Sequence, residues 1–204
     1  MVKNLIRLLI GSVVASFSIA CVINSTLGSF SVSAMNISVA NLTGLSMGTV
    51  GFILEVAMLL TAMKLGEGIG VTAIVNATLN SYLVDFFHMI LPTSPYLILG
   101  LPLVAVGWKL MGESAMGDTG SNILTTALMK KTRKSLGMLR AIQETVYFSI
   151  GLISASQYIT PLTIILTLGL GYMLEFIYKL IKYNPIEVEH QFLIGGKEKI
   201  VENN

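Results

Sequence analysis

The sequence predicts an all-α membrane protein with six transmembrane helices in two inverted three-helix repeats, on the basis of composition, segment length and charge placement. Of its 204 residues, 53% are hydrophobic and 12% are charged, and the mean hydropathy is +0.77. A soluble domain carries about 25% charged residues. This shortage of charge excludes a soluble enzyme, a disordered chain and a basic nucleic-acid-binding protein. The single cysteine, Cys21, excludes a disulfide framework and a cysteine-based metal site.

Six apolar segments reach or approach the roughly 20 residues that a helix needs to cross the hydrocarbon of a bilayer. They cover residues 5–23, 46–63, 69–91, 95–112, 136–155 and 160–181. The first long connection, 24–45, is uncharged, and its stretch 33–40 is expected either to dip back into the membrane as a short helix or to lie on its surface. The same alternatives apply to the connection 113–135. The glycine-rich residues 66–70 are expected to form a flexible turn, and the chain from 184 onward is expected to be polar and solvated.

The basic residues predict the orientation of these helices. With the N-terminus in the cytoplasm, all 13 Lys and Arg residues fall on the cytoplasmic side, and the outer connections contain none. Arg140 belongs to this count as a residue beside the long inner loop. Because basic residues favour the cytoplasmic side during insertion, the sequence predicts that both termini lie inside the cell.

The sequence contains an internal repeat at an offset of 89 residues. The residues that coincide at this offset are Gly11 and Gly100, Ser46 and Ser135, Gly48 and Gly137, and Glu55 and Glu144. Asp85 and Glu175 coincide when the offset is increased by one residue. Three spans per copy make the repeat inverted, as in many secondary transporters, where the substrate site lies near mid-depth between the copies. We therefore divide the chain into a first three-span repeat (1–92), a second three-span repeat (93–183) and a cytoplasmic polar tail (184–204).

Two glutamates near the middle of predicted spans are the candidate binding residues. A carboxylate at the depth of Glu55 or Glu144 costs a few kcal/mol even on lenient insertion scales. Each is therefore expected to face a partner or a hydrated cavity, or to be protonated. Arg140, one turn before Glu144, offers a structural alternative as an ion-pair partner, and it would also neutralise Glu55 across the bundle. Gln143, next to Glu144, is expected to add hydrogen bonds at the site or between helices.

A polar stripe runs along the third predicted span. Asp85, Asn80 and Asn76 lie about a turn apart on one face, and we expect them to line the pathway of a solute. The alternative is hydrogen bonding between helices, which is worth roughly 0.6 kcal/mol per contact. The residues assigned to a re-entrant or gating segment are Ser33, Asn36, Ser46 and Thr49. No catalytic residue, metal site or cofactor is expected, and His88 has no clustered companions that would make it a metal ligand.

A set of motifs in the first half of the chain indicates a family. They are Leu27-Gly28, Gly44-Leu45-Ser46-Met47-Gly48-Thr49, Gly68-Ile69-Gly70, Asn76, Asp85 and Pro92. Over roughly residues 11–92 this pattern resembles the YczE/YitT-type bacterial membrane proteins, and the second half resembles them mainly in hydropathy. The resemblance implies a small multi-pass protein of the bacterial inner (plasma) membrane, in a largely uncharacterised family to which transport is attributed. Ser29-Phe30-Ser31 and Glu55 depart from the family pattern and indicate a branch with its own ligand.

These observations predict a secondary transporter, coupled to protons or cations, for a small solute that is cationic or bears an amine. Glu55 is the expected binding and coupling residue, and Glu144 is its partner. The other expected partners are the lipid bilayer and, if the protein dimerises, a second copy; nucleic acid and enzymatic activity are not expected. The alternatives are the membrane substrate-binding subunit of an energy-coupling-factor importer and a non-transporting protein that assists assembly or regulation. A passive channel would differ from a carrier by a lack of saturation.

Overall fold

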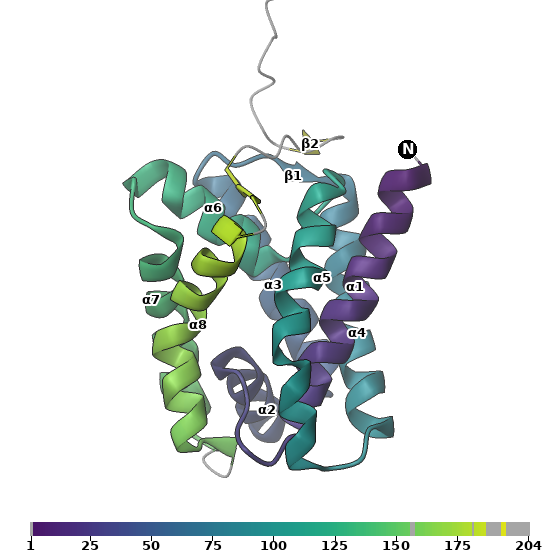
Figure 1. Ribbon diagram of the computed structural model, residues 1–204, viewed down its shortest axis with the longest axis vertical. Coiled ribbons are helices and arrows are strands. Elements are labelled where there is room, and N and C mark those ends of the chain that lie inside the picture. Colours follow the sequence, from purple (N-terminus) through teal and green to yellow (C-terminus); the bar gives the residue numbers. More distant parts are fainter. Residues whose placement is uncertain (1, 156–157, 181, 187–192, 195–204) are drawn as a thin grey trace, which may run out of the picture.

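The computed structural model describes residues 2–155, 158–180, 182–186 and 193–194, most of which belong to a bundle of helices (Figure 1). The helices of the described part are α1 (Val2–Ile23), α2 (Ser31–Thr43), α3 (Met47–Lys64), α4 (Val71–Ile90), the 3₁₀-helix η1 (Pro95–Gly100), α5 (Leu101–Glu113), α6 (Gly120–Thr132), α7 (Leu136–Gly151) and α8 (Pro161–Leu180). The prediction that the protein is mainly helical is confirmed.

Three of these helices are long and apolar enough to cross a membrane. They are α1, α3 and α8, with mean hydropathies of 2.2, 1.5 and 1.5 over their most apolar stretches. The outward face of α8 is apolar, since Ile165, Phe176 and Leu180 are 65, 67 and 72% exposed. Large apolar side chains that share an exposed face are typical of a surface that contacts lipid or another protein. The structure is therefore compatible with a membrane protein that has at least these three spans.

Local sequence explains where several helices begin. Ser46 and Ser135 are the N-caps of α3 and α7, and their hydroxyls accept hydrogen bonds from the backbone N–H groups of Thr49 at 3.1 Å and Met138 at 3.3 Å. Such caps satisfy N–H groups that have no partner within the helix. The helices α2 and α6 have 13 residues each, and α6 starts 89 residues after α2, as α7 does after α3.

The two short helices lie toward opposite ends of the bundle. In Figure 1, α2 lies low and α6 lies high, with α7 and α8 on one side and α1, α4 and α5 on the other. Both α2 and α6 pack against α3 and α7. Because α2 buries Ser33, Ala34 and Met35, the stretch 33–40 is part of a helix that packs inside the protein.

Small residues allow α1 and α5 to approach closely. A side chain on Gly107 would have no room, because its Cβ would lie 2.6 Å from the backbone nitrogen of Ala15. Further along the same contact, the Ser18 hydroxyl donates a hydrogen bond to the carbonyl oxygen of Gly100 at 2.6 Å. Small residues and short polar contacts of this kind are how helices associate in membranes. The surrounding core continues through Trp108 to α8.

The structure corrects the expectations for the loop at 66–70 and for the polar tail. Residues Ile69–Gly70 form a strand, β1, that pairs in antiparallel with β2 (Leu193–Ile194) from the tail. The pairing gives backbone groups of both segments hydrogen-bond partners, and Ile69 is only 2% exposed. The flexible turn is therefore shorter than expected, and part of the tail lies on the protein. Residues 187–192 and 195–204 lie outside the described part of the chain.

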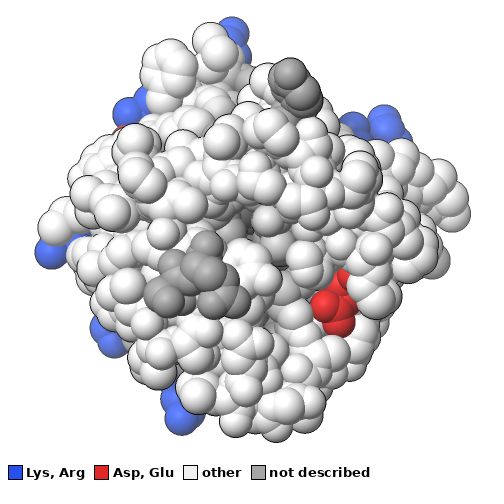
Figure 2. All heavy atoms as spheres, turned by 90° about the horizontal axis from the view of Figure 1, so that it is seen from below, with Lys and Arg blue, Asp and Glu red and all other residues white. Residues whose placement is uncertain are grey.

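Basic residues are sparse at one end of the bundle. Figure 2 shows that end, opposite the N-terminus, with Lys and Arg atoms only along its outline. Toward the other end, Lys130 in the last turn of α6 forms an ion pair with Glu67 at 2.5 Å. Arg140 is an exception that corrects the prediction, because it is 2% exposed inside the bundle and does not lie beside a loop. It is buried because α7 begins at Leu136, which places Arg140 a full turn into the helix on its inward face.

Candidate functional site

Glu55 lies near the middle of α3 and faces the start of α6. Its Oε2 atom accepts a hydrogen bond from the backbone N–H of Gly120, the first residue of α6. The helix starts at this point because Thr119 is its N-cap, with a hydroxyl that accepts the Asn122 N–H at 3.3 Å. Glycine permits the approach, since a Cβ at position 120 would collide with the backbone of α3. The N-terminus of a helix carries partial positive charge and stabilises an anion, so α6 positions the Glu55 carboxylate.

Glu144 holds the matching position in α7 and faces the start of α2. Its carboxylate lies beside Ser31 and Val32, the first two residues of α2. Glu144 is 2% exposed, and its Oε2 atom has no hydrogen-bond partner among the described residues. Each of the two predicted acids therefore meets the N-terminus of a short helix from the other half of the chain.

The guanidinium of Arg140 lies among the buried polar groups between α5, α6 and α7. It donates hydrogen bonds to the Ser121 hydroxyl and, at 2.9 Å, to the Asn122 side-chain oxygen. It also lies 4.9 Å from the centroid of the Trp108 ring, a cation–π contact that is stronger when both groups are shielded from water. These contacts direct the guanidinium toward the start of α6.

This direction explains why the ion pair between Arg140 and Glu144, which was the structural alternative for Glu144, does not form. Within the described residues, the ion pairs closer than 4 Å join other residues. The guanidinium instead attracts three carboxylates at longer range, those of Glu55, Asp118 and Glu144. It is a shared cation at the centre of the bundle.

Asp118 is a third carboxylate at this place that sequence reasoning did not single out. It is 7% exposed, and its Oδ1 atom accepts the Thr119 backbone N–H at 2.7 Å and the Asn122 side-chain N–H at 2.9 Å. An aspartate just before a threonine N-cap is a signal for a helix start, which would have located α6 but not the burial of Asp118. Its charge lies beside that of Glu55 at the same helix start.

The central groups have more negative than positive charge. When they are ionised, the carboxylates of Glu55, Asp118 and Glu144 and the single guanidinium of Arg140 give a formal net charge of −2. The N-termini of α2 and α6 contribute about +0.5 each, which offsets about half of it. Because uncompensated charge is costly inside a membrane protein, the arrangement can take up a cation or protons.

A cavity of about 70 Å³ lies beside Glu55 among α1, α2, α3 and α4, and we call it the first cavity. Besides Glu55, its polar lining residues are Ser33, Asn36, Asn80 and Ser81. This volume has room for a few water molecules. The structure thus brings together four residues that the sequence singled out from three separate segments, namely Glu55, Ser33, Asn36 and Asn80.

The polar stripe on α4 is directed mainly toward α1. The side-chain oxygen of Asn76 accepts a hydrogen bond from the Ser12 hydroxyl, and that of Asn80 accepts one from Ser16. Both serines are fully buried. These contacts are the hydrogen bonding between helices that was the alternative for the stripe, although Asn80 also lines the first cavity.

Four other predicted residues do not line the first cavity. Asp85, in α4, lies against the start of α3, where a Cβ on Gly48 would be 2.7 Å from its Oδ2 atom. Gln143 accepts a hydrogen bond at 2.6 Å from a threonine of α6. Ser46 and Thr49 form the N-cap of α3. In this structure these four residues support helix starts and helix contacts.

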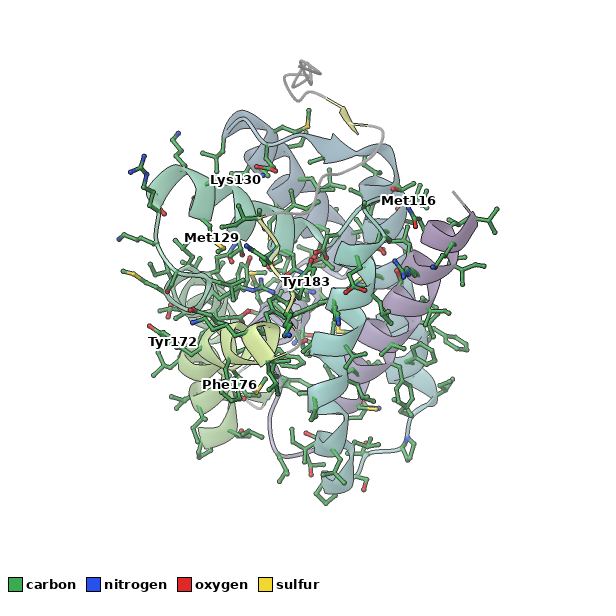
Figure 3. The ribbon with its side chains drawn as sticks, turned by 45° about the horizontal axis from the view of Figure 1, so that its top comes forward. Met116, Met129, Lys130, Tyr172, Phe176 and Tyr183 are labelled. Carbon is green, nitrogen blue, oxygen red and sulfur yellow. The ribbon has the colours of Figure 1, made fainter. Side chains whose placement is uncertain are left out.

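Tyr183, three residues after the end of α8, lies beside Arg140. In Figure 3 it lies near the middle of the bundle next to α8, whereas Tyr172 and Phe176 point outward. Its ring meets that of Tyr178 edge to face, with centroids 4.8 Å apart. Burial raises the pKa of the Tyr183 hydroxyl, which therefore stays neutral. With Arg140 it lines a pocket of about 10 Å³, which we call the second pocket.

Comparison with known proteins bears on the first half of the chain. A family of unknown function, DUF6198, matches residues 2–97. The matched part runs from α1 into η1 and includes Glu55 and the residues of the first cavity, but not α6 or α7. No curated protein and no solved structure matches the sequence. The family description states no activity, so the resemblance to YczE/YitT-type proteins stays a prediction.

Proposed function

We propose that the chain forms six spans in two inverted halves in a bacterial inner membrane, with both termini in the cytoplasm. The helices α4, η1 with α5, and α7 pack beside the three candidate spans and would complete the six. The recurring offset of 89 residues between helix starts supports the repeat. The positions of α2 and α6 toward opposite ends of the bundle (Figure 1) support its inversion.

We propose further that this fold is a secondary transporter for a small cationic or amine-bearing solute, coupled to protons or another cation. The observation that carries the proposal is the excess of carboxylates at the centre, one of which, Glu55, lines the first cavity. Inside a protein, charges interact more strongly than in water, so the excess negative charge attracts either a cation or protons. The same site can therefore bind a cation in one state of the carrier and protons in another. Glu55 is the principal binding residue because it lines the first cavity, whereas Glu144 is fully enclosed.

The contacts of the short helices supply a means of coupling. Glu55 accepts a hydrogen bond from Gly120 of the second half, and Glu144 lies beside Ser31 and Val32 of the first. In transporters with inverted repeats, one half moves against the other around the site. Such a movement would change the surroundings of both carboxylates together, and with them the affinity for protons and solute.

The experiment that tests this function measures solute-driven proton movement into liposomes that contain the purified protein and a trapped pH-sensitive dye. With a panel of small amines, at least one solute should move protons at a rate that saturates with its concentration. Glu55→Gln should abolish this flux while the protein still inserts and elutes as the same species. Glu113→Gln is the matched control, since this carboxylate is exposed and pairs with Lys109 at 3.4 Å. Unchanged flux and pH dependence in Glu55→Gln would refute the proposal.

A further inference from the structure

The two halves place different groups at equivalent positions. In the proposed repeat, the first cavity and the second pocket share five corresponding positions among their lining residues. The corresponding positions, at an offset of 89 or, for the last helix, 90 residues, are Ser33 and Asn122, Asn36 and Thr125, Met47 and Leu136, Gly51 and Arg140, and Val84 and Leu174. The first cavity and the second pocket are therefore the same location in two copies of one fold.

The second pocket is filled by a guanidinium that belongs to the chain. Arg140 holds this group against Ser121, Asn122 and Trp108, and about 10 Å³ of space is left beside it. The equivalent residue in the first half is Gly51, which has no side chain, and about 70 Å³ stays open there. The first cavity thus has open space and an acidic lining residue, Glu55, where its counterpart holds a guanidinium.

The groups around Gly51 suit a cation with several N–H donors. A Cβ on Gly51 would lie 3.3 Å from the side-chain nitrogen of Asn36 and 3.4 Å from the Ser81 hydroxyl, so both side chains border the open space. The Asn36 Oδ1 atom is buried and has no hydrogen-bond partner in the described part of the chain. Leaving a buried acceptor unsatisfied is unfavourable. Glu55 supplies negative charge to the same lining.

We propose that the first cavity binds a small organic cation of the guanidinium type, in the place that the Arg140 guanidinium occupies in the other half. This inference rests on the proposed carrier function and names its substrate class. The bound cation donates hydrogen bonds to the Glu55 carboxylate and to Asn36 Oδ1. A planar cation with donors along its edge matches carboxylate and amide oxygens. A guanidinium is also more weakly hydrated than an ammonium, which lowers the cost of entering an enclosed site.

The test is equilibrium dialysis of the purified full-length protein in detergent against radiolabelled guanidinium chloride at low millimolar concentration. Unlabelled urea is the decisive competitor, because it has a similar planar shape and N–H donors but no charge. We expect saturable guanidinium binding that excess urea does not displace. Glu55→Gln should weaken binding on the order of tenfold or more, because a hydrogen bond to a charged group is lost.

Two glycine substitutions separate filling of the first cavity from general damage. Gly51→Arg should abolish guanidinium binding, because the chain then supplies its own guanidinium, as Arg140 does in the second pocket. Gly169→Ala, outside the first cavity, is the control and should retain binding, since a Cβ there has no atom within 4 Å. Size-exclusion elution identifies the folded species for each variant.

Displacement by urea as effective as by unlabelled guanidinium, or unchanged guanidinium binding in folded Gly51→Arg, would overturn the inference. If Gly51→Arg does not fold, the urea competition and Glu55→Gln decide the question by the same criteria. Guanidinium binding without any solute-driven proton flux would support this inference and refute the carrier. Proton flux driven by another amine, without guanidinium binding, would refute this inference alone.

Discussion

Replacement of Arg140 by glutamine is expected to destabilise the protein strongly, because it removes the cation that the central carboxylates share. Removing one member of a buried ionic set costs about 3–5 kcal/mol. The structure favours the upper part of that range, since the hydrogen bonds to Ser121 and Asn122 and the contact with Trp108 would be lost as well. For a chain of 204 residues, 1 kcal/mol corresponds to roughly 2–4 °C in Tm. The expected decrease in Tm is therefore on the order of 10–20 °C at pH 8.

The decrease caused by Arg140→Gln should also depend on pH. At pH 8 the formal charge of the central groups falls from −2 to −3 in the variant. At pH 5 part of this excess is removed by protonation of Asp118, because burial raises its pKa to about 6. Thermal unfolding in detergent between pH 5 and pH 8 measures this difference. Lys131→Gln, at an exposed position near the end of α6, is the control and should leave Tm unchanged. An unchanged Tm at pH 8, or an equal loss at both pH values, would refute the reasoning.

Three further substitutions separate the central site from its scaffold. Gly120→Ala should abolish proton flux and lower the free energy of unfolding by about 1–3 kcal/mol, because a Cβ there collides with α3. Gly169→Ala is the control and should change neither the flux nor the free energy of unfolding, because a Cβ there has no atom within 4 Å. Ser12→Ala should lower the free energy of unfolding by about 1–3 kcal/mol, measured in denaturant, because a buried amide of α4 loses its partner. Glu175→Gln should lower it by about 1 kcal/mol at most and leave proton flux intact, because its ion pair is exposed. Loss of flux in Ser12→Ala or Glu175→Gln together with normal flux in Gly120→Ala would contradict these assignments.

The helices could be predicted closely because their signals are local. The apolar segment 46–63 corresponds to α3 (Met47–Lys64), and the segment 160–181 corresponds to α8 (Pro161–Leu180). Apolar length and a capping residue such as Ser46 act within one or two turns of the chain. Glu55 could be singled out for a related reason, since an acid within a long apolar segment requires compensation wherever the segment packs.

The composition of the central site could not be predicted, because it depends on contacts between distant segments. Arg140 lies close enough to a basic loop to be counted with it, and its burial follows only from the packing of α7 against α5 and α6. Asp118 is an ordinary loop residue until the start of α6 is brought next to Glu55. The pairing of β1 with β2 joins residues more than 120 positions apart, for which neither segment carries a local signal.

The most direct test of the account is whether a proton gradient concentrates the solute through Glu55. In liposomes that contain the wild-type protein, an imposed proton gradient should drive accumulation of an amine identified in the dye assay above its equilibrium concentration. In liposomes with Glu55→Gln, the same gradient should produce no accumulation. Accumulation to the wild-type level in the glutamine variant would show that coupling does not depend on Glu55 and would contradict the account.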